Sequence, residues 1–248
     1  MPYPIGRDGA GRLLSVCGGV AFALHDRRDK VVSIMFDNIP LFTGLGKKDL
    51  DIINRHTLAK TFPTHALLLR EGDKSDSLYF ILYGKVKVYI CDDEGSEAIL
   101  NIQGSGDCFG EMALLDDAPR SASVMTMEPT RVAIMTKAAF KDCLANHPDI
   151  AYNLIRTLTQ RVRVLSGNVR NLALLDVYGR VARTLLSLAK PSDPHLVIDQ
   201  KLTHQDIASM VGASREMVSR ILKDLSNQGY IKVERRRITL FEKLARKH

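Results

Sequence analysis

Residues 203–222 constrain the fold more than any other part of the chain, because they hold two amphipathic helical patterns separated by a glycine. Thr203, with Asp206 three residues later, has the pattern of a capping box at the start of the first helix. Gly212 permits a tight turn, and Ser214 is a preferred N-cap for the second helix. We therefore predict a helix-turn-helix, whose second helix enters a groove of DNA.

The second helix of this pattern has one apolar and one polar face. At about 100° per residue, Val218, Ile221 and Leu222 fall on one side, opposite Glu216 and Arg220. Arginine can bind guanine bidentately, and glutamate can accept from cytosine N4. The alternative is an ordinary solvated helix face. The residues that we expect to contact DNA are Ser214, Arg215, Glu216, Ser219, Arg220 and Lys223.

Positive charge is concentrated in residues 177–248, which hold 14 Lys and Arg residues against 7 Asp and Glu residues. The whole chain carries a net charge of +7, so the residues before Val177 sum to zero. A basic C-terminal third favours contact with nucleic acid, although a solvated basic surface is the alternative. We predict a winged helix-turn-helix domain over residues 177–248. It begins with a helix and a loop at 190–194, and ends in a hairpin wing at 231–240 that carries Arg235, Arg236 and Arg237.

A heptad-like apolar pattern precedes this domain and predicts one long helix over residues 148–176. Its apolar residues are spaced by three and four, and the flanks are polar. A narrow, sustained stripe favours a two-helix coiled coil, and therefore a homodimer interface, over a helix that packs on its own domain. The stripe comprises Ile155, Leu158, Val162, Leu165, Val169 and Leu172.

Residues 31–147 predict a short helix at 47–56, followed by many short strands between glycine turns. In one of these strands, Val86, Val88 and Ile90 alternate with polar neighbours and should share a face. So many short strands in one segment are typical of a β-sandwich or jelly roll, which makes the fold class α+β. The expected strands are 66–70, 77–82, 85–90, 97–102, 121–127 and 130–135.

The first 30 residues show no regular period. Residues 13–24 have the pattern of a weak signal peptide, but Gly18 and Gly19 interrupt it. We expect a disordered tail or an over-extended start, with Met35 nearer to the true start.

The four cysteines have neither CxxC nor metal-ligand spacing, so we expect no metal site, no redox motif and a reducing compartment, the cytoplasm. They are Cys17, Cys91, Cys108 and Cys143. No apolar run is long enough to span a membrane. No pairing of a nucleophile with a base stands out, so we expect no enzymatic activity.

Over residues 36–241 the chain resembles the cyclic-AMP receptor protein family of the CRP/FNR superfamily. Residues 110–115 and 119–122 resemble the family's phosphate-binding cassette. Residues 171–177 resemble its hinge, and residues 214–223 resemble its recognition helix. The resemblance implies a homodimer that binds double-stranded, pseudo-palindromic promoter DNA with TGTGA-like half-sites and contacts RNA polymerase.

The resemblance also implies an allosteric ligand, cyclic AMP or a similar cyclic nucleotide. Arg120 would make charge-assisted hydrogen bonds to the phosphate, Gly110 would let the backbone approach it, and Glu111 would accept from the ribose 2′-hydroxyl. Alternatively, Glu111 and Arg120 form a structural ion pair, and the regulator is ligand-independent or responds to another molecule such as a cyclic dinucleotide. The ligand-binding candidates are Gly110, Glu111, Met112, Ala113, Arg120, Ser121, Leu165 and Ser166.

One position departs from the family pattern. The family's long helix carries a Thr-Ser pair that touches the purine, and this chain has Leu165-Ser166 there. Because leucine cannot hydrogen-bond a base, we expect weaker discrimination between bases. Leu165 also belongs to the apolar stripe, where it would pack against the partner helix with no polar group to satisfy, so we expect appreciable DNA binding without nucleotide. The alternative is that Leu165 turns toward the β-sandwich and has no effect.

Three related classes of protein fit the sequence less well. An iron–sulfur member needs four cysteines, typically near the N-terminus, and only Cys17 lies there. As axial ligands of a haem, His65, Cys91 and Cys108 are unconvincing. A kinase regulatory subunit would lack the helix-turn-helix.

Overall fold

The computed structural model describes residue 36 and residues 39–74, 76–199, 202–234 and 237–241, together with the backbone of three strands nearer the N-terminus. The chain divides into two compact units, Met1–Ile34 and Met35–His248. In the first unit, β1 (Ile5–Arg7), β2 (Leu13–Cys17) and β3 (Val20–Ala23) form an antiparallel sheet. These strands are not among those expected from the sequence. The disordered tail or over-extended start stays a prediction, and Met35 lies outside the described residues.

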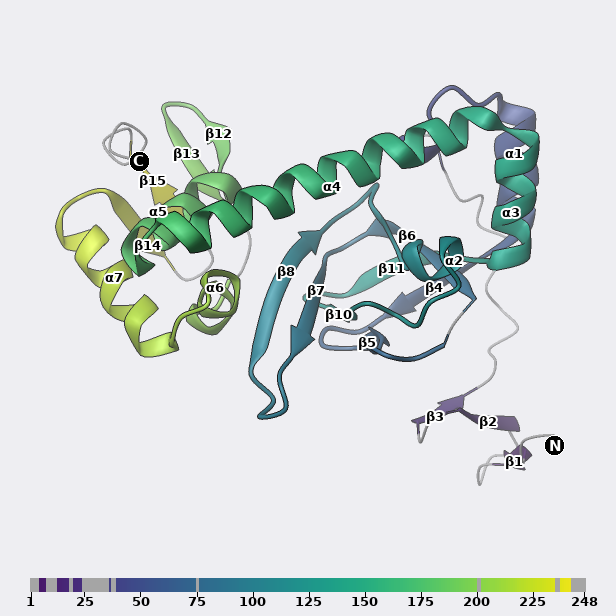
Figure 1. The fold of residues 1–248 in the computed structure, drawn as a ribbon, viewed down its shortest axis with the longest axis horizontal. Coiled ribbons are helices and arrows are strands. Elements are labelled where there is room, and N and C mark those ends of the chain that lie inside the picture. The colour runs from purple at the N-terminus through teal and green to yellow at the C-terminus, as the bar shows by residue number, and fades with distance from the viewer. Residues whose placement is uncertain are drawn as a thin grey trace. The chain divides into compact units, whose positions relative to one another are not determined.

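Two four-stranded antiparallel sheets form the β-roll of the second unit, in the orders β5-β10-β7-β8 and β4-β11-β6-β9 (Figure 1). Ile81, Val86 and Val132 are fully buried between them. The β-sandwich of the jelly-roll type is thereby confirmed, whereas β4 and β9 were missed. The strands are β4 (Thr57–Phe62), β5 (Leu67–Leu69), β6 (Ser77–Tyr83), β7 (Val86–Cys91), β8 (Glu97–Gln103), β9 (Cys108–Phe109), β10 (Ser123–Thr126) and β11 (Thr130–Thr136).

Strand β7 keeps the alternation that the sequence suggests. Its register with β8 shifts between Val88 and Tyr89, but the extra residue, Leu100, lies on β8, and the pairing of β7 with β10 is regular. Val86 is buried and Val88 packs against the same core cluster, which confirms that these two share a face. Lys87 lies over the ring of Tyr89 on the opposite face. Ile90 is half-buried.

Helices flank the two sheets of the β-roll. They are the 3-10 helix η2 (Pro40–Phe42) and the α-helices α1 (Lys47–Arg55), α2 (Met112–Leu115) and α3 (Lys137–Asn146). Helix α3, which was not expected from the sequence, begins where the Thr136 hydroxyl accepts from the Ala139 N–H. The rings of Phe36, Phe42 and Phe80 pack together with centroids 5.0–6.0 Å apart, which ties η2 to β6.

Helix α4 (Pro148–Leu174) runs from the β-roll to the C-terminal helices (Figure 1). It ends two residues before the predicted Asp176, because that residue caps the next helix instead. The Asp176 carboxylate accepts from the Gly179 N–H at 2.8 Å and starts α5 (Val177–Leu188). Ile150 and Leu154 are the buried residues of α4.

The C-terminal domain packs α5, α6 (His204–Val211) and α7 (Arg215–Asn227) around a core that includes Val181, Leu185, Val218 and Leu225. A four-stranded sheet in the order β12-β13-β15-β14 completes it. The strands are β12 (Lys190–Ser192), β13 (His195–Ile198), β14 (Ile231–Glu234) and β15 (Arg237–Leu240).

The wing of this domain is larger than the sequence suggests. The predicted hairpin is present as β14 and β15, with Arg235 and Arg236 outside the described residues. The loop predicted at 190–194 is wrong in part, because its first three residues form β12. Backbone hydrogen bonds of β12 to β13, and of β13 to β15, extend the two-stranded wing into one sheet.

Candidate functional site

A pocket of the β-roll contains most of the predicted ligand-binding residues. It encloses about 420 Å³, part of which is open to solvent. Six of the eight candidates line it: Gly110, Glu111, Met112, Ala113, Arg120 and Ser121. Leu165 and Ser166 do not line it and are exposed on α4, so their contact with a ligand stays a prediction. The remaining lining residues are Leu69, Val88, Gln103, Phe109, Ala122, Val124 and Arg161.

Arg120 is held against the backbone of a glycine turn. Its side chain is 3% exposed and donates to the carbonyl of Gly110 at 2.5 Å and to that of Ser77 at 2.6 Å. Gly110 has φ 86°, and a Cβ atom there would lie 2.7 Å from Nη1 of Arg120, so only glycine fits. Burial lowers the pKa of the Arg120 guanidinium, while Tyr79 and Glu111 raise it. Arginine stays protonated in proteins, so the pocket holds a buried positive charge.

Glu111 is the buried acid of the pocket, at 2% exposure. Its Oε1 accepts from Nη1 of Arg161 at 2.5 Å, and the second terminal nitrogen of Arg161 donates to the Cys108 carbonyl. Its Oε2 is buried without a hydrogen-bond partner among the described residues. A buried acceptor of this kind is unfavourable unless another group donates to it.

Two polar residues of the pocket, Arg161 and Gln103, were not expected from the sequence. Arg161 stands on the polar flank of α4 and is 50 positions from Glu111, so only the fold brings the two together. Gln103 ends β8, is 4% exposed, and its Oε1 likewise has no hydrogen-bond partner in the described part of the chain. No spacing rule singles out either residue.

The cysteines do not add a reactive group to this pocket. Burial raises the pKa of the Cys108 thiol to about 12, so the thiolate needed for nucleophilic attack or metal binding is not formed at neutral pH. Cys91 and Cys143 are also free, and the side chain of Cys17 lies outside the described residues. Where side chains are described, no cluster of three His, Cys, Asp or Glu residues could hold a metal ion.

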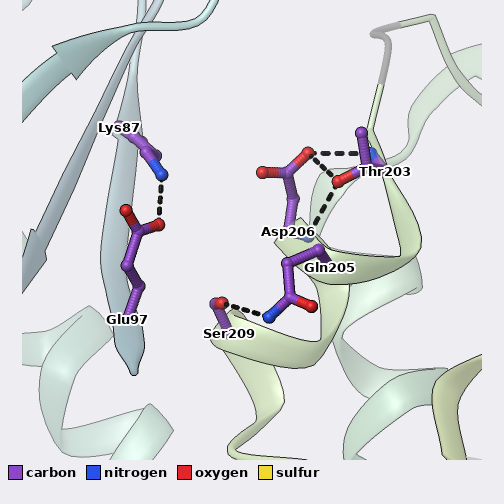
Figure 2. A network of polar contacts seen from close by, with 6 residues as sticks. All are labelled: Lys87, Glu97, Thr203, Gln205, Asp206 and Ser209. Atoms are coloured by element: carbon purple, nitrogen blue, oxygen red, sulfur yellow. Dashed lines mark hydrogen bonds and ion pairs between the residues drawn. The ribbon is translucent and has the colours of Figure 1, made fainter. Parts of the chain in front are cut away.

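The caps predicted for the helix-turn-helix are present, as Figure 2 shows for α6. The Asp206 N–H donates to the Thr203 hydroxyl at 3.0 Å, and the Thr203 N–H donates to the Asp206 carboxylate at 2.8 Å. Gly212 ends α6 with φ 63°. The Ser214 hydroxyl accepts from the Met217 N–H at 3.2 Å and starts α7. Thr203 and Asp206 therefore fix the start of α6, Gly212 its end and Ser214 the start of α7.

Figure 2 also shows α6 beside the β7–β8 hairpin of the β-roll. An ion pair between Lys87 and Glu97 joins the two strands of that hairpin. On α6, the Gln205 side chain donates to the Ser209 hydroxyl at 3.5 Å.

Helix α7 presents its predicted polar face to solvent. Its buried residues are Val218, Ile221, Leu222 and Leu225. The six residues expected to contact DNA are all exposed: Ser214, Arg215, Glu216, Ser219, Arg220 and Lys223. Arg215 is the first residue of the helix, where a recognition helix meets the groove. The geometry is that of a recognition helix, and the individual base contacts stay predictions.

The predicted apolar stripe of α4 does not pack on its own domain. Its members Ile155, Val162, Leu165, Val169 and Leu172 are 45% to 65% exposed, and Leu158 is half-buried. The helix instead turns Ile150, Leu154 and Arg161 toward the β-roll, about a quarter turn away on a helical wheel. An exposed apolar stripe of this length is characteristic of an interaction surface.

No helix in the described part of the chain is both long and apolar enough to cross a membrane.

Comparison with known proteins agrees with both halves of the structure. Residues 59–147 match the cyclic nucleotide-binding domain family, and residues 179–246 match the Crp-like helix-turn-helix domain family. The chain is 34% identical over 213 residues to the CRP-like cAMP-activated global transcriptional regulator of Mycobacterium tuberculosis, covering 84% of this chain and 95% of the relative. It is 38% identical over 190 residues to the cAMP-activated global transcriptional regulator CRP of Salmonella typhimurium, covering 75% and 90%.

Solved structures give the same assignment of the fold. The c-di-GMP responsive global regulator CLP of Xanthomonas campestris superposes with a TM-score of 0.70 at 26% identity, covering 79% of this chain and 99% of CLP. The β-roll lies almost entirely in the range matched by the cyclic nucleotide-binding family, and the capped helix-turn-helix lies in the range matched by the Crp-like family. The chain belongs to the CRP-like family of DNA-binding transcription regulators, with an N-terminal cyclic nucleotide-binding domain and a C-terminal Crp-like helix-turn-helix.

Proposed function

We propose that this regulator is a homodimer whose binding to promoter DNA is controlled by cyclic AMP in the β-roll pocket. The observation that carries the proposal is that two buried groups of opposite charge, Arg120 and Glu111, line the same pocket. The Arg120 guanidinium supplies a positive charge, and the Glu111 Oε2 is an acceptor with no hydrogen-bond partner among the described residues. A cyclic ribose phosphate has a complementary anion and a hydroxyl donor.

Each group has a defined part in this proposal. Arg120, beside the close backbone approach that Gly110 permits, would bind the phosphate through charge-assisted hydrogen bonds. Glu111, held by Arg161, would accept from the ribose 2′-hydroxyl through Oε2. Ser121 would add a donor near the phosphate. The named activity of the relatives from Mycobacterium tuberculosis and Salmonella typhimurium, which are cAMP-activated, supports the same choice.

A cyclic dinucleotide is the second candidate ligand, because CLP is c-di-GMP responsive by name. The charges of the pocket favour a mononucleotide. Two arginines line it, but Arg161 is paired with Glu111 and the carbonyl of Cys108. One buried guanidinium matches one phosphate better than two.

The effect of the ligand on DNA binding would depend on the dimer. Two α4 helices would bury the exposed stripe against each other, as in a coiled coil. The two α7 helices would then read TGTGA-like half-sites about 34 Å apart, one helical turn. The protein would act in the cytoplasm by binding and not by catalysis, with RNA polymerase as its partner at the promoter.

Calorimetry of the whole protein against cyclic AMP, cyclic GMP and cyclic di-GMP tests the ligand. Fluorescence anisotropy with a labelled DNA that carries two inverted TGTGA half-sites, with and without each nucleotide, tests the response. Tightest binding of cyclic AMP, with tighter DNA binding in its presence, is expected. Binding of cyclic di-GMP alone would replace the first candidate with the second.

A further inference from the structure

Gln103 is a buried amide in the apolar part of the ligand pocket. It is the last residue of β8, where it pairs with Val86 of β7. The walls around it include Leu69, Phe109 and Val124, which belong to the core of the β-roll. Its Oε1 is buried with no hydrogen-bond partner among the described residues, although a buried amide is normally paired.

The other polar side chains of the pocket already have a proposed ligand group or a partner within the protein. Glu111 and Arg120 suit a ribose and a phosphate, and Ser121 lies beside Arg120 in the chain. Arg161 is committed to Glu111 and to the Cys108 carbonyl. The base of a nucleotide would therefore occupy the apolar remainder of the pocket, where Gln103 provides the polar side chain. Leu165 and Ser166 of α4 do not line this part.

The chemistry of an amide matches a base edge. Glutamine presents a donor and an acceptor side by side, and a flip of the amide exchanges the two positions. Adenine offers an amino group next to a ring-nitrogen acceptor, the pattern that glutamine reads bidentately in DNA. A base without the exocyclic group would leave one end of the amide unpaired, which is unfavourable in a buried site.

We propose that Gln103 is a specificity-determining residue, whose amide hydrogen-bonds the base edge of the bound nucleotide. The inference rests on the proposed function, because it assumes a cyclic mononucleotide in this pocket. In this proposal the base is recognised by Gln103 of β8 and not by α4, where the chain has Leu165. Discrimination is thereby retained against bases that lack an exocyclic hydrogen-bonding group.

The test compares cyclic AMP with purine riboside 3′,5′-cyclic monophosphate, which lacks only the 6-amino group. Calorimetry on the whole wild-type protein should give about 3- to 10-fold tighter binding of cyclic AMP, the effect of one hydrogen bond. In Gln103→Met, which keeps the length and volume of the side chain without its polar atoms, the ratio should fall close to one. Gln205→Met, an exchange of the same kind at an exposed residue of α6 outside the pocket lining, should keep the wild-type ratio.

Thermal unfolding without nucleotide separates a reading role from a structural one. Replacing an unpaired buried amide by an apolar group of similar shape is neutral or stabilising, so Gln103→Met should melt at or above the wild-type temperature. A lower melting temperature would show that the amide is structural and would overturn the inference.

The outcomes also distinguish the two proposals. Equal wild-type affinity for the two nucleotides, or an unchanged ratio in Gln103→Met, overturns the role of Gln103 while the pocket stands as the nucleotide site. Failure of the wild type to bind either nucleotide overturns both proposals together.

Discussion

The recognition helix and the ligand pocket of this protein differ in how their residues are brought together. The residues expected to contact DNA lie between Ser214 and Lys223 on one exposed helix face. The pocket collects side chains from strands of both sheets of the β-roll, the turn after β9, α2 and α4, and its central ion pair joins residues 50 positions apart. A surface built on one helix can be identified from its period, whereas a pocket built from many elements needs the fold.

The comparison also separates two kinds of polar residue. On α7 the charged groups are exposed, so each can be changed with little effect on the fold. In the pocket Glu111 and Arg120 are almost fully buried, and Arg120 holds two backbone carbonyls. Changes in the pocket therefore have to be checked for folding, and changes on α7 for sequence preference.

The largest effect is expected from a charge in the stripe that lies between the two regions. Val169→Asp places a carboxylate where the second α4 would pack, and desolvating an unpaired charge costs several kcal/mol. The variant should be a monomer in sedimentation velocity, with about 100-fold or weaker binding to the paired half-sites. It would show that DNA binding can be lost without a change in either the pocket or α7.

Asn168→Asp is the matched control, because it adds the same charge at the neighbouring exposed residue outside the stripe. It should remain a dimer. If Val169→Asp sedimented as a dimer too, the interface would lie elsewhere on the protein.

The second effect should be confined to the pocket. Arg120→Ala removes the buried cation, and hydrogen bonds to a charged group are worth about 1.5–3 kcal/mol, so calorimetry should show about 10- to 150-fold weaker binding of cyclic AMP. Arg55→Ala removes an exposed arginine of α1 outside the pocket and should leave the affinity unchanged.

Because Arg120 also bonds to the backbone, circular dichroism should accompany this measurement. A folded Arg120→Ala protein with wild-type nucleotide affinity would exclude this pocket as the site.

The third effect should be confined to α7. Glu216→Ala removes an acceptor for a cytosine amino group, and one such contact discriminates by about 1–3 kcal/mol. Selection of binding sites from random DNA should show relaxed preference at one position of the half-site, with a smaller loss of total affinity. Glu234→Ala in the wing removes an equal charge and should keep the preferred sequence. Recovery of an unrelated motif by the wild type would contradict this assignment of the recognition helix.

The smallest effect concerns the coupling between the two regions. Leu165 lies in the exposed stripe, and burying a leucine is worth about 1.5–3 kcal/mol relative to exposing it. If Leu165 packs in the dimer, the free protein is shifted toward its DNA-binding state. Leu165→Thr should then weaken DNA binding without nucleotide by about 10-fold, the shift that ~1.4 kcal/mol produces.

The anisotropy measurement without and with cyclic AMP checks this prediction. If the wild type required saturating nucleotide and Leu165→Thr behaved in the same way, Leu165 would have no part in the coupling.

The sequence alone identified the features whose cause is local. The capping box at Thr203, the turn at Gly212, the cap at Ser214 and the heptad stripe of α4 depend on residues a few positions apart, and all are present. The family and the six pocket residues between Gly110 and Ser121 also followed from contiguous motifs. In each case short-range hydrogen bonding or helical period decides the structure, so residues close together in the sequence are enough to predict it.

Only the tertiary structure decided the features that depend on distant partners. The addition of β12 to the wing, the ion pair of Glu111 with Arg161 and the burial of Gln103 all require two elements to meet. No spacing in the sequence predicts such contacts, because packing of the whole domain decides which side chains face one another. The DNA-binding half could therefore be predicted in detail, whereas the pocket could be predicted only where the family motif covers it.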